Sequence, residues 1–134
     1  KSRERALQAL YQVDVGRAAP RAALDAAAAA EDAVALDAEQ QAFAVELVTG
    51  VVDNLADLDT TIQKASTNWR VERMAKIDRN VLRLGSFELK FRTDTPAAVV
   101  INEAIELGKA YGTAESSAFI NAVLDKVAKD LGRK

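Results

Sequence analysis

Apolar residues recur every three or four positions along most of this 134-residue chain, and this spacing constrains the fold more than any other feature. The clearest stripe is Ile77, Val81, Leu84, Phe87 and Phe91. Steps of three and four place side chains on one face of an α-helix, whereas a half-buried strand alternates every two residues. Because strand signals are nearly absent, the sequence predicts an all-α helical bundle.

Capping residues, prolines and glycines divide the chain into about six to seven helices. Ser2 and Thr95 are the expected caps of two of them, and Asp37 with Gln40 has the spacing of a capping box. Gly50 lies inside a helical pattern and is expected to mark a close helix contact. The expected segments are 2–16, 20–30, one long helix over 37–68, a short turn at 71–74, a helix around 77–91, 96–112, and a last helix from Thr113 or Ser116.

The central helix, around residues 77–91, carries a second apolar stripe. Leu82 and Leu89 stand seven positions apart, away from the first stripe. A helix that is apolar on several sides is typical of a buried position. We therefore expect this helix to be covered by its neighbours on most sides, within one domain over residues 1–134, because domains of this length are usual.

The composition excludes most catalytic chemistry. The chain has no Cys and no His, which removes disulfides, thiolate nucleophiles, His-based acid–base catalysis and ordinary zinc sites. The six glycines form neither a dinucleotide-binding motif nor a P-loop. The acid pairs Asp57/Asp59 and Glu103/Glu106 are interpreted as surface acids. We expect no enzyme, no catalytic residue, no cofactor and no metal, and a binding function instead.

Basic residues are concentrated at the two ends of the chain. Residues 1–21 hold five bases against two acids, residues 22–68 one base against nine acids, and residues 69–134 twelve bases against nine acids. A basic end on an acidic body can attract polyanions, but a solvated face is the simpler interpretation of this charge distribution. Lys1, Arg3 and Arg5 crowd the start of the first helix, against its dipole, which favours a role in holding phosphates.

Three aromatic residues are candidates for stacking on unpaired RNA bases: Tyr11, Tyr111 and Phe119. Burial in the core is the alternative for each of them. The chain contains no apolar stretch near the ~18 residues that a membrane helix needs, and its start does not read as a signal peptide. With no cysteine, we expect a cytoplasmic protein.

Several segments together resemble one family. Residues 95–128, TPAAVVINEAIELGKAYGTAESSAFINAVLDKVA, are similar to the carboxy-terminal signature of NusB transcription antitermination factors. Residues 76–89 (KIDRNVLRLGSFEL) resemble the preceding helix of that family, and residues 3–12 (RERALQALYQ) resemble its first helix. The order and spacing match over nearly the whole chain.

The resemblance implies an all-helical protein of two packed halves, here about 1–68 and 69–134. It implies binding of boxA, a short single-stranded RNA element of ribosomal RNA leader transcripts, together with the ribosomal protein NusE. The pair then joins NusA and NusG on RNA polymerase and suppresses termination. Since some members are monomers and others homodimers, the oligomeric state stays open.

The resemblance also implies site residues. The family's basic amino terminus matches Lys1 and Arg3, and its ALY motif supplies Tyr11; Arg5 is included for its charge alone. The loop before the last helix supplies Glu115, where a shorter acid is more usual. The remaining transferred residues are Tyr111 and Phe119 for RNA and Asp78 for the protein partner.

Two alternatives remain at this point. The same helical domain precedes the catalytic domain of some ribosomal RNA cytosine methyltransferases, although no cofactor-binding α/β segment is present here. The other alternative is a helical adaptor that binds proteins only.

Overall fold

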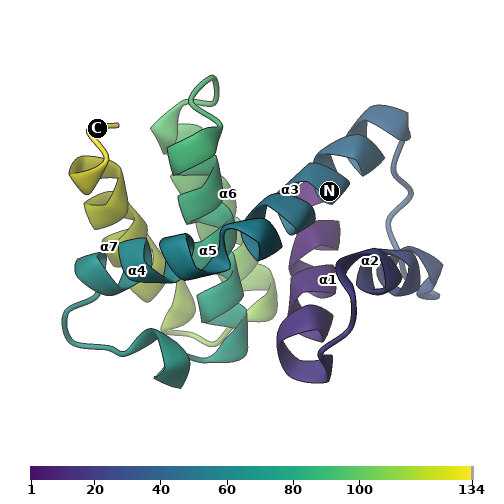
Figure 1. Cartoon of the computed structure of the whole chain (residues 1–134), viewed down its shortest axis with the longest axis horizontal. Coiled ribbons are helices and arrows are strands. Elements are labelled where there is room, and N and C mark those ends of the chain that lie inside the picture. Colours follow the sequence, from purple (N-terminus) through teal and green to yellow (C-terminus); the bar gives the residue numbers. More distant parts are fainter. Residues whose placement is uncertain (134) are drawn as a thin grey trace.

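The computed structural model describes residues 1–133, which form seven α-helices and one short 3-10 helix, with no strand among them (Figure 1). This confirms the predicted all-α fold. The bounds are α1 Ser2–Gly16, α2 Pro20–Ala29, α3 Ala38–Asp53, α4 Leu55–Ala65, η1 Val71–Arg73, α5 Lys76–Phe91, α6 Ala97–Tyr111 and α7 Ser116–Asp130. The last residue of the predicted domain, Lys134, lies outside the described residues.

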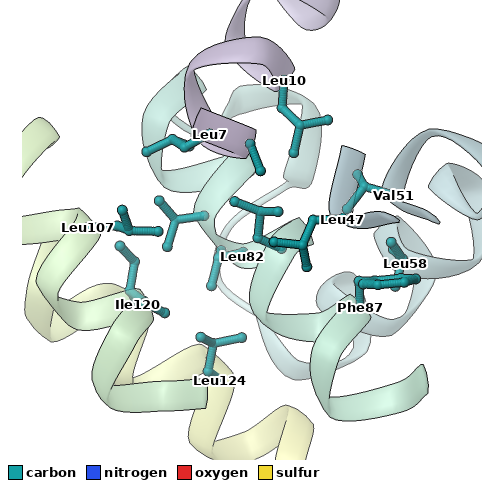
Figure 2. Close-up of a cluster of buried hydrophobic side chains, with 14 of the residues drawn as sticks. Leu7, Leu10, Leu47, Val51, Leu58, Leu82, Phe87, Leu107, Ile120 and Leu124 are labelled. Carbon is teal, nitrogen blue, oxygen red and sulfur yellow. The ribbon is translucent and has the colours of Figure 1, made fainter. Parts of the chain in front are cut away.

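Helix α5 is the centre of the fold. It packs against α1, α3, α4, α6 and α7, and every residue from 79 to 89 is buried. Figure 2 shows Leu82 and Phe87 of α5 among apolar side chains contributed by these neighbours. The expectation of a helix covered on most sides is therefore confirmed. Burial of this much apolar surface is the main driving force for folding.

Helix α2 packs against α1 and α3 instead of α5. Figure 1 shows α1 and α2 on one side of the molecule and α6 and α7 on the other. Helix α4 packs against α5 and also against α7, far along the chain. Among the described residues, no helix combines the length and apolar character that a membrane crossing requires. The division into halves at residues 68 and 69 stays a prediction.

The expected long helix over 37–68 is wrong, because the chain breaks it at Asn54. This residue has φ −118° and ψ 21°, outside helical values. Its side-chain Nδ2 donates to the carbonyl of Gly50 at 2.7 Å. An asparagine side chain competes with the backbone for local hydrogen bonds, so α3 ends and α4 begins although the apolar spacing continues.

Two of the expected caps are also corrected. Helix α1 begins at Ser2 itself, and the Ser2 hydroxyl donates to the carbonyl of Gln40 at 3.0 Å, which joins α1 to α3. Helix α6 begins after Pro96, so Thr95 is not its cap. The capping box of α3 is confirmed: Asp37 accepts from the Gln40 backbone at 2.8 Å, and the Gln40 side chain accepts from the Asp37 backbone at 3.0 Å.

The remaining helix ends differ in detail. Helix α1 ends at Gly16 as expected, but the left-handed residue is Arg17, with φ 56°. Helix α7 begins at Ser116 with Glu115 at the cap position, and the Ser116 hydroxyl accepts a hydrogen bond from the Thr113 backbone at 2.9 Å. Neither predicted cap of α7 therefore occupies that position.

Candidate nucleic-acid interface

The two predicted tyrosines line one cleft. Tyr11 lies on α1 and Tyr111 is the last residue of α6, so the fold brings together positions one hundred residues apart. Their cleft has a volume of about 210 Å³ and a mostly apolar surface. Its lining residues are Leu7, Gln8, Tyr11, Gln12, Ile77 and Tyr111. Neither ring is fully buried, so both keep a surface on which a base can stack.

Tyr111 is anchored to the first helix. Its hydroxyl donates to the Glu4 carboxylate at 3.1 Å. Partial burial, together with this hydrogen bond to a negative charge, raises the pKa of the Tyr111 hydroxyl above its usual value. The phenol therefore stays protonated at neutral pH and continues to hold the end of α6 against the start of α1.

A second cleft gathers the predicted residues Asp78, Glu115 and Phe119. It has a volume of about 300 Å³. Its remaining lining residues are Trp69, Arg73, Met74 and Ala75. Phe119 packs edge-on against Trp69, with ring centroids 6.3 Å apart and planes at 80°. Two aromatic residues in contact therefore line one cleft.

Trp69 was not among the predicted site residues, yet it is the most exposed large apolar side chain of the described chain, at 60%. The available signal was its place in a polar segment between two helical patterns, where a core tryptophan is unexpected. An exposed aromatic beside a cleft is a feature of binding surfaces.

The first turn of α5 separates the two clefts. Ile77 lines the first and the neighbouring Asp78 lines the second. The Asp78 Oδ1 atom is buried and has no hydrogen-bond partner within residues 1–133. A buried acceptor without a donor is costly. A binding partner would reach Asp78 through the part of this residue that remains exposed in the second cleft.

The three predicted cations differ in their surroundings. Lys1 is exposed. Arg3 donates through Nε and Nη2 to the Glu88 carboxylate at 2.8 and 2.7 Å, and its guanidinium lies 5.3 Å from the centre of the Phe43 ring. The hydrogen bonds to Glu88 raise the pKa of Arg3 above its usual value. The structure thus gives Arg3 an internal partner as well as an exposed edge.

Arg5 is 8% exposed and donates to the carbonyl of Val34. This contact fastens the segment between α2 and α3 to the first helix. This internal partner holds the guanidinium of Arg5 away from the solvent. The predicted contact of Arg5 with RNA stays a prediction.

Two further cations lie near the clefts and were missed from the sequence. Arg73 lines the second cleft, and Lys76 is exposed at the start of α5. Both side chains are exposed, and within residues 1–133 neither forms an ion pair, although the charge of Arg73 contributes to lowering the pKa of the neighbouring Glu72. The sequence offered one indication of them, because Arg73 and Lys76 stand three residues apart where α5 begins. No group of side chains suited to holding a metal ion occurs in the part of the chain that the structure describes.

Comparisons with known proteins give a consistent result. The model of the NusB family matches residues 1–129. The transcription antitermination protein NusB of Myxococcus xanthus is 53% identical over 132 residues, which covers 98% of this chain and 94% of that protein. The NusB protein of Sorangium cellulosum is 52% identical, with coverage of 98% and 91%.

Solved structures agree with the sequences. The structure of T. maritima NusB superimposes with a TM-score of 0.85 at 33% identity, covering 96% of this chain and 89% of that one. A crystal structure of the antitermination factors NusB and NusE in complex with double-stranded RNA gives a TM-score of 0.86 at 26% identity, with coverage of 96% and 94%. The chain therefore belongs to the NusB family of transcription antitermination proteins.

Proposed function

We propose that this antitermination factor binds the single-stranded boxA element of ribosomal RNA leader transcripts together with NusE. The complex would then act with NusA and NusG on RNA polymerase, and thus in the cytoplasm, where bacterial transcripts are made. One observation carries the proposal: the Tyr111–Glu4 hydrogen bond unites the start of α1 and the end of α6. This contact brings Tyr111 to the start of α1, where Lys1 and Arg3 also lie, and Tyr11 lines the same cleft as Tyr111. Phe119 lies at the second cleft, and Arg5 is directed toward Val34.

The family membership confirms that the chain is an antitermination factor of a non-catalytic family and not an enzyme. The methyltransferase alternative receives no support, because the relatives are NusB proteins matched over nearly their whole length. A protein-only adaptor is disfavoured by the unpaired cations and the half-exposed rings beside the clefts, which suit nucleic acid.

In the proposed arrangement, Lys1 and the exposed edge of Arg3 contact the RNA backbone. Tyr11 and Tyr111 stack on unpaired bases in the first cleft, since each base on an aromatic ring is worth ~1–3 kcal/mol. Phe119 and Glu115 continue the RNA path along the second cleft. The basic side chains orient the strand, and the rings hold its bases.

The second cleft also suits the protein partner. Asp78 is partly exposed in this cleft, and NusE would supply a donor to its carboxylate. In this arrangement RNA and NusE would bind next to each other in the second cleft, with RNA at Phe119 and NusE at Asp78. A chain with a net charge of −2 is a weak binder of polyanions alone, so a basic partner that completes the surface should strengthen RNA binding. A crystal structure containing NusB, NusE and RNA supports such joint binding in a relative.

The test is a shift assay with a boxA-containing RNA, with and without NusE, and with a scrambled RNA as control. We expect the affinity for boxA RNA to rise when NusE is added. Equal affinity with and without the partner, or equal affinity for the scrambled RNA, would contradict the proposal.

A further inference from the structure

The first cleft is bordered by two glutamine side chains on α1. Gln8 and Gln12 stand four residues apart, and such positions lie on the same face of a helix. Both side chains are exposed, and both line the cleft between Tyr11 and Tyr111. The cleft therefore combines aromatic surfaces with two carboxamide groups at its edge.

The lining of this cleft determines which ligand it suits. None of its six lining side chains carries a charge, so a phosphate would find no counterion there. A nucleobase has the matching chemistry, because it offers a flat face for the tyrosine rings and an edge of donors and acceptors. RNA-binding modules read unpaired bases in this way, by stacking and by hydrogen bonds to the base edge.

The two amides differ in their freedom. The Tyr111 hydroxyl interacts with Gln8 as well as with Glu4, so Gln8 is held toward the end of α6. The Gln12 side chain makes no hydrogen bond within the described residues. Only its backbone carbonyl is engaged, and it accepts from the backbone N–H groups of Arg17 and Ala18, which follow α1. A carboxamide offers two donors and an acceptor, and that of Gln12 is available to a ligand.

We infer that Gln12, assisted by Gln8, reads the edge of one unpaired RNA base held between Tyr11 and Tyr111. In this arrangement the rings hold the base, and the glutamines are the specificity-determining residues. The inference rests on the proposed function. It identifies the side chains that select the base at one position of the RNA.

The experiment uses the full chain with NusE and a set of synthetic single-stranded RNAs that carry boxA with each base replaced in turn. Affinities are measured by fluorescence anisotropy for the unchanged protein and for Gln12→Ala. We expect one RNA position at which the unchanged protein prefers its base by about 5- to 150-fold, the range for a well-formed amide–base contact. At that position Gln12→Ala should discriminate less than about 3-fold, with discrimination elsewhere unchanged.

Two further variants sharpen the result. Gln41→Ala removes an exposed amide of α3 outside the cleft and should leave all preferences unchanged. Gln12→Glu keeps the size of the side chain but offers only acceptors, so the preference should move toward bases that present an amino group. Thermal unfolding of each variant verifies that the fold is intact.

Three outcomes would overturn the inference. The first is that Gln12→Ala binds every RNA more weakly by one common factor, which would assign the amide a structural role. The second is that this variant binds all RNAs as the unchanged protein does. The third is that it binds NusE more weakly in the absence of RNA, which would assign the cleft to a side chain of the protein partner. If instead the unchanged protein fails to bind boxA RNA even with NusE, the proposed function itself fails.

Discussion

The hydroxyl of Tyr111 donates a hydrogen bond to the carboxylate of Glu4 at 3.1 Å, across 107 positions of sequence. This contact joins the end of α6 to the first turn of α1. It also fixes one wall of the cleft that Tyr11 and Tyr111 line together. The ring of Tyr111 is thus held by its hydroxyl while part of its surface stays exposed, an arrangement suited to stacking.

Replacing Tyr111 tests the stacking role. Tyr111→Ala should weaken binding of boxA RNA in the presence of NusE by about 5- to 150-fold, since a stacked base is worth ~1–3 kcal/mol. Tyr111→Phe keeps the ring and should stay within about 3-fold. Phe91→Ala, which removes another exposed ring outside both clefts, is the control for anisotropy measurements. An equal loss for the Phe and Ala variants would show that the hydroxyl, and not the ring, is needed.

The two basic side chains at the start of α1 should respond differently to removal. Lys1→Ala should flatten the slope of log affinity against log salt by roughly 0.7, the value for one phosphate contact of a single strand, without changing stability. Arg3→Ala should flatten the slope similarly, and should also lower the free energy of unfolding by about 3 kcal/mol, because Glu88 is left buried without its partner. Salt titrations and urea denaturation measure the two effects, with the exposed Arg21→Ala as control.

Asp78 should be needed for the protein partner more than for RNA. Asp78→Ala removes the unpartnered acceptor of the second cleft, and we expect NusE to bind at least about 10-fold more weakly, which corresponds to ~1.4 kcal/mol. Titration calorimetry without RNA gives this value directly. Glu106→Ala, which removes an exposed acid of α6, should bind NusE normally. A variant that loses RNA affinity but keeps NusE affinity would move Asp78 to the RNA site.

The features predicted correctly from the sequence are those set by local chemistry. The stripes of α5 follow from the periodic placement of Leu82, Phe87 and their neighbours, and the capping box of Asp37 and Gln40 needs only three intervening peptide bonds. Asn54 was missed because the apolar spacing continues across it, while the break depends on a competing side-chain hydrogen bond.

The candidate site was harder to predict because its residues have partners far along the chain. Arg3 looks like a free cation in the sequence, yet its partner Glu88 stands 85 positions away. Likewise, nothing near Arg5 indicates that it binds the carbonyl of Val34. Charge in a sequence predicts where cations are numerous, whereas tertiary packing decides which of them remain available to a ligand.

Gly50 was expected to mark a close helix contact, and the structure confirms it. A Cβ atom at this position would lie 2.3 Å from the ring of Phe87. Gly50→Ala should lower the free energy of unfolding by about 1 kcal/mol or more, because overpacking outweighs the helix propensity that alanine adds. A Cβ atom at Gly16 would lie 3.5 Å from the side chain of Gln12, which is ordinary contact. Gly16→Ala should therefore leave the free energy of unfolding unchanged or raise it slightly. Equal effects of the two substitutions in urea denaturation would argue against a tight contact.

A buried charge network connects α1 to α5. The Asp14 carboxylate accepts from Arg79 at 2.6 Å, from Asn80 at 3.1 Å and from Arg83 at 3.4 Å. Arg83 also pairs with Asp59 of α4 at 2.8 Å. Three helices are therefore joined by ion pairs with little access to solvent, where removal of one partner leaves the others without compensation.

Desolvation opposes ionisation of Asp14, but its arginine partners prevail and lower the pKa of this carboxyl. A lowered pKa in the folded state means that the ion pairs stabilise the fold above the unfolded value of about 3.9 and lose that contribution as the pH falls further. Asp14→Asn should therefore cost about 3 kcal/mol at pH 7, and its deficit should shrink below about pH 4. Urea denaturation between pH 7 and pH 3 measures this, with Asp25→Asn as the exposed control. A deficit that is independent of pH would mean that the charge of Asp14 does not stabilise the fold.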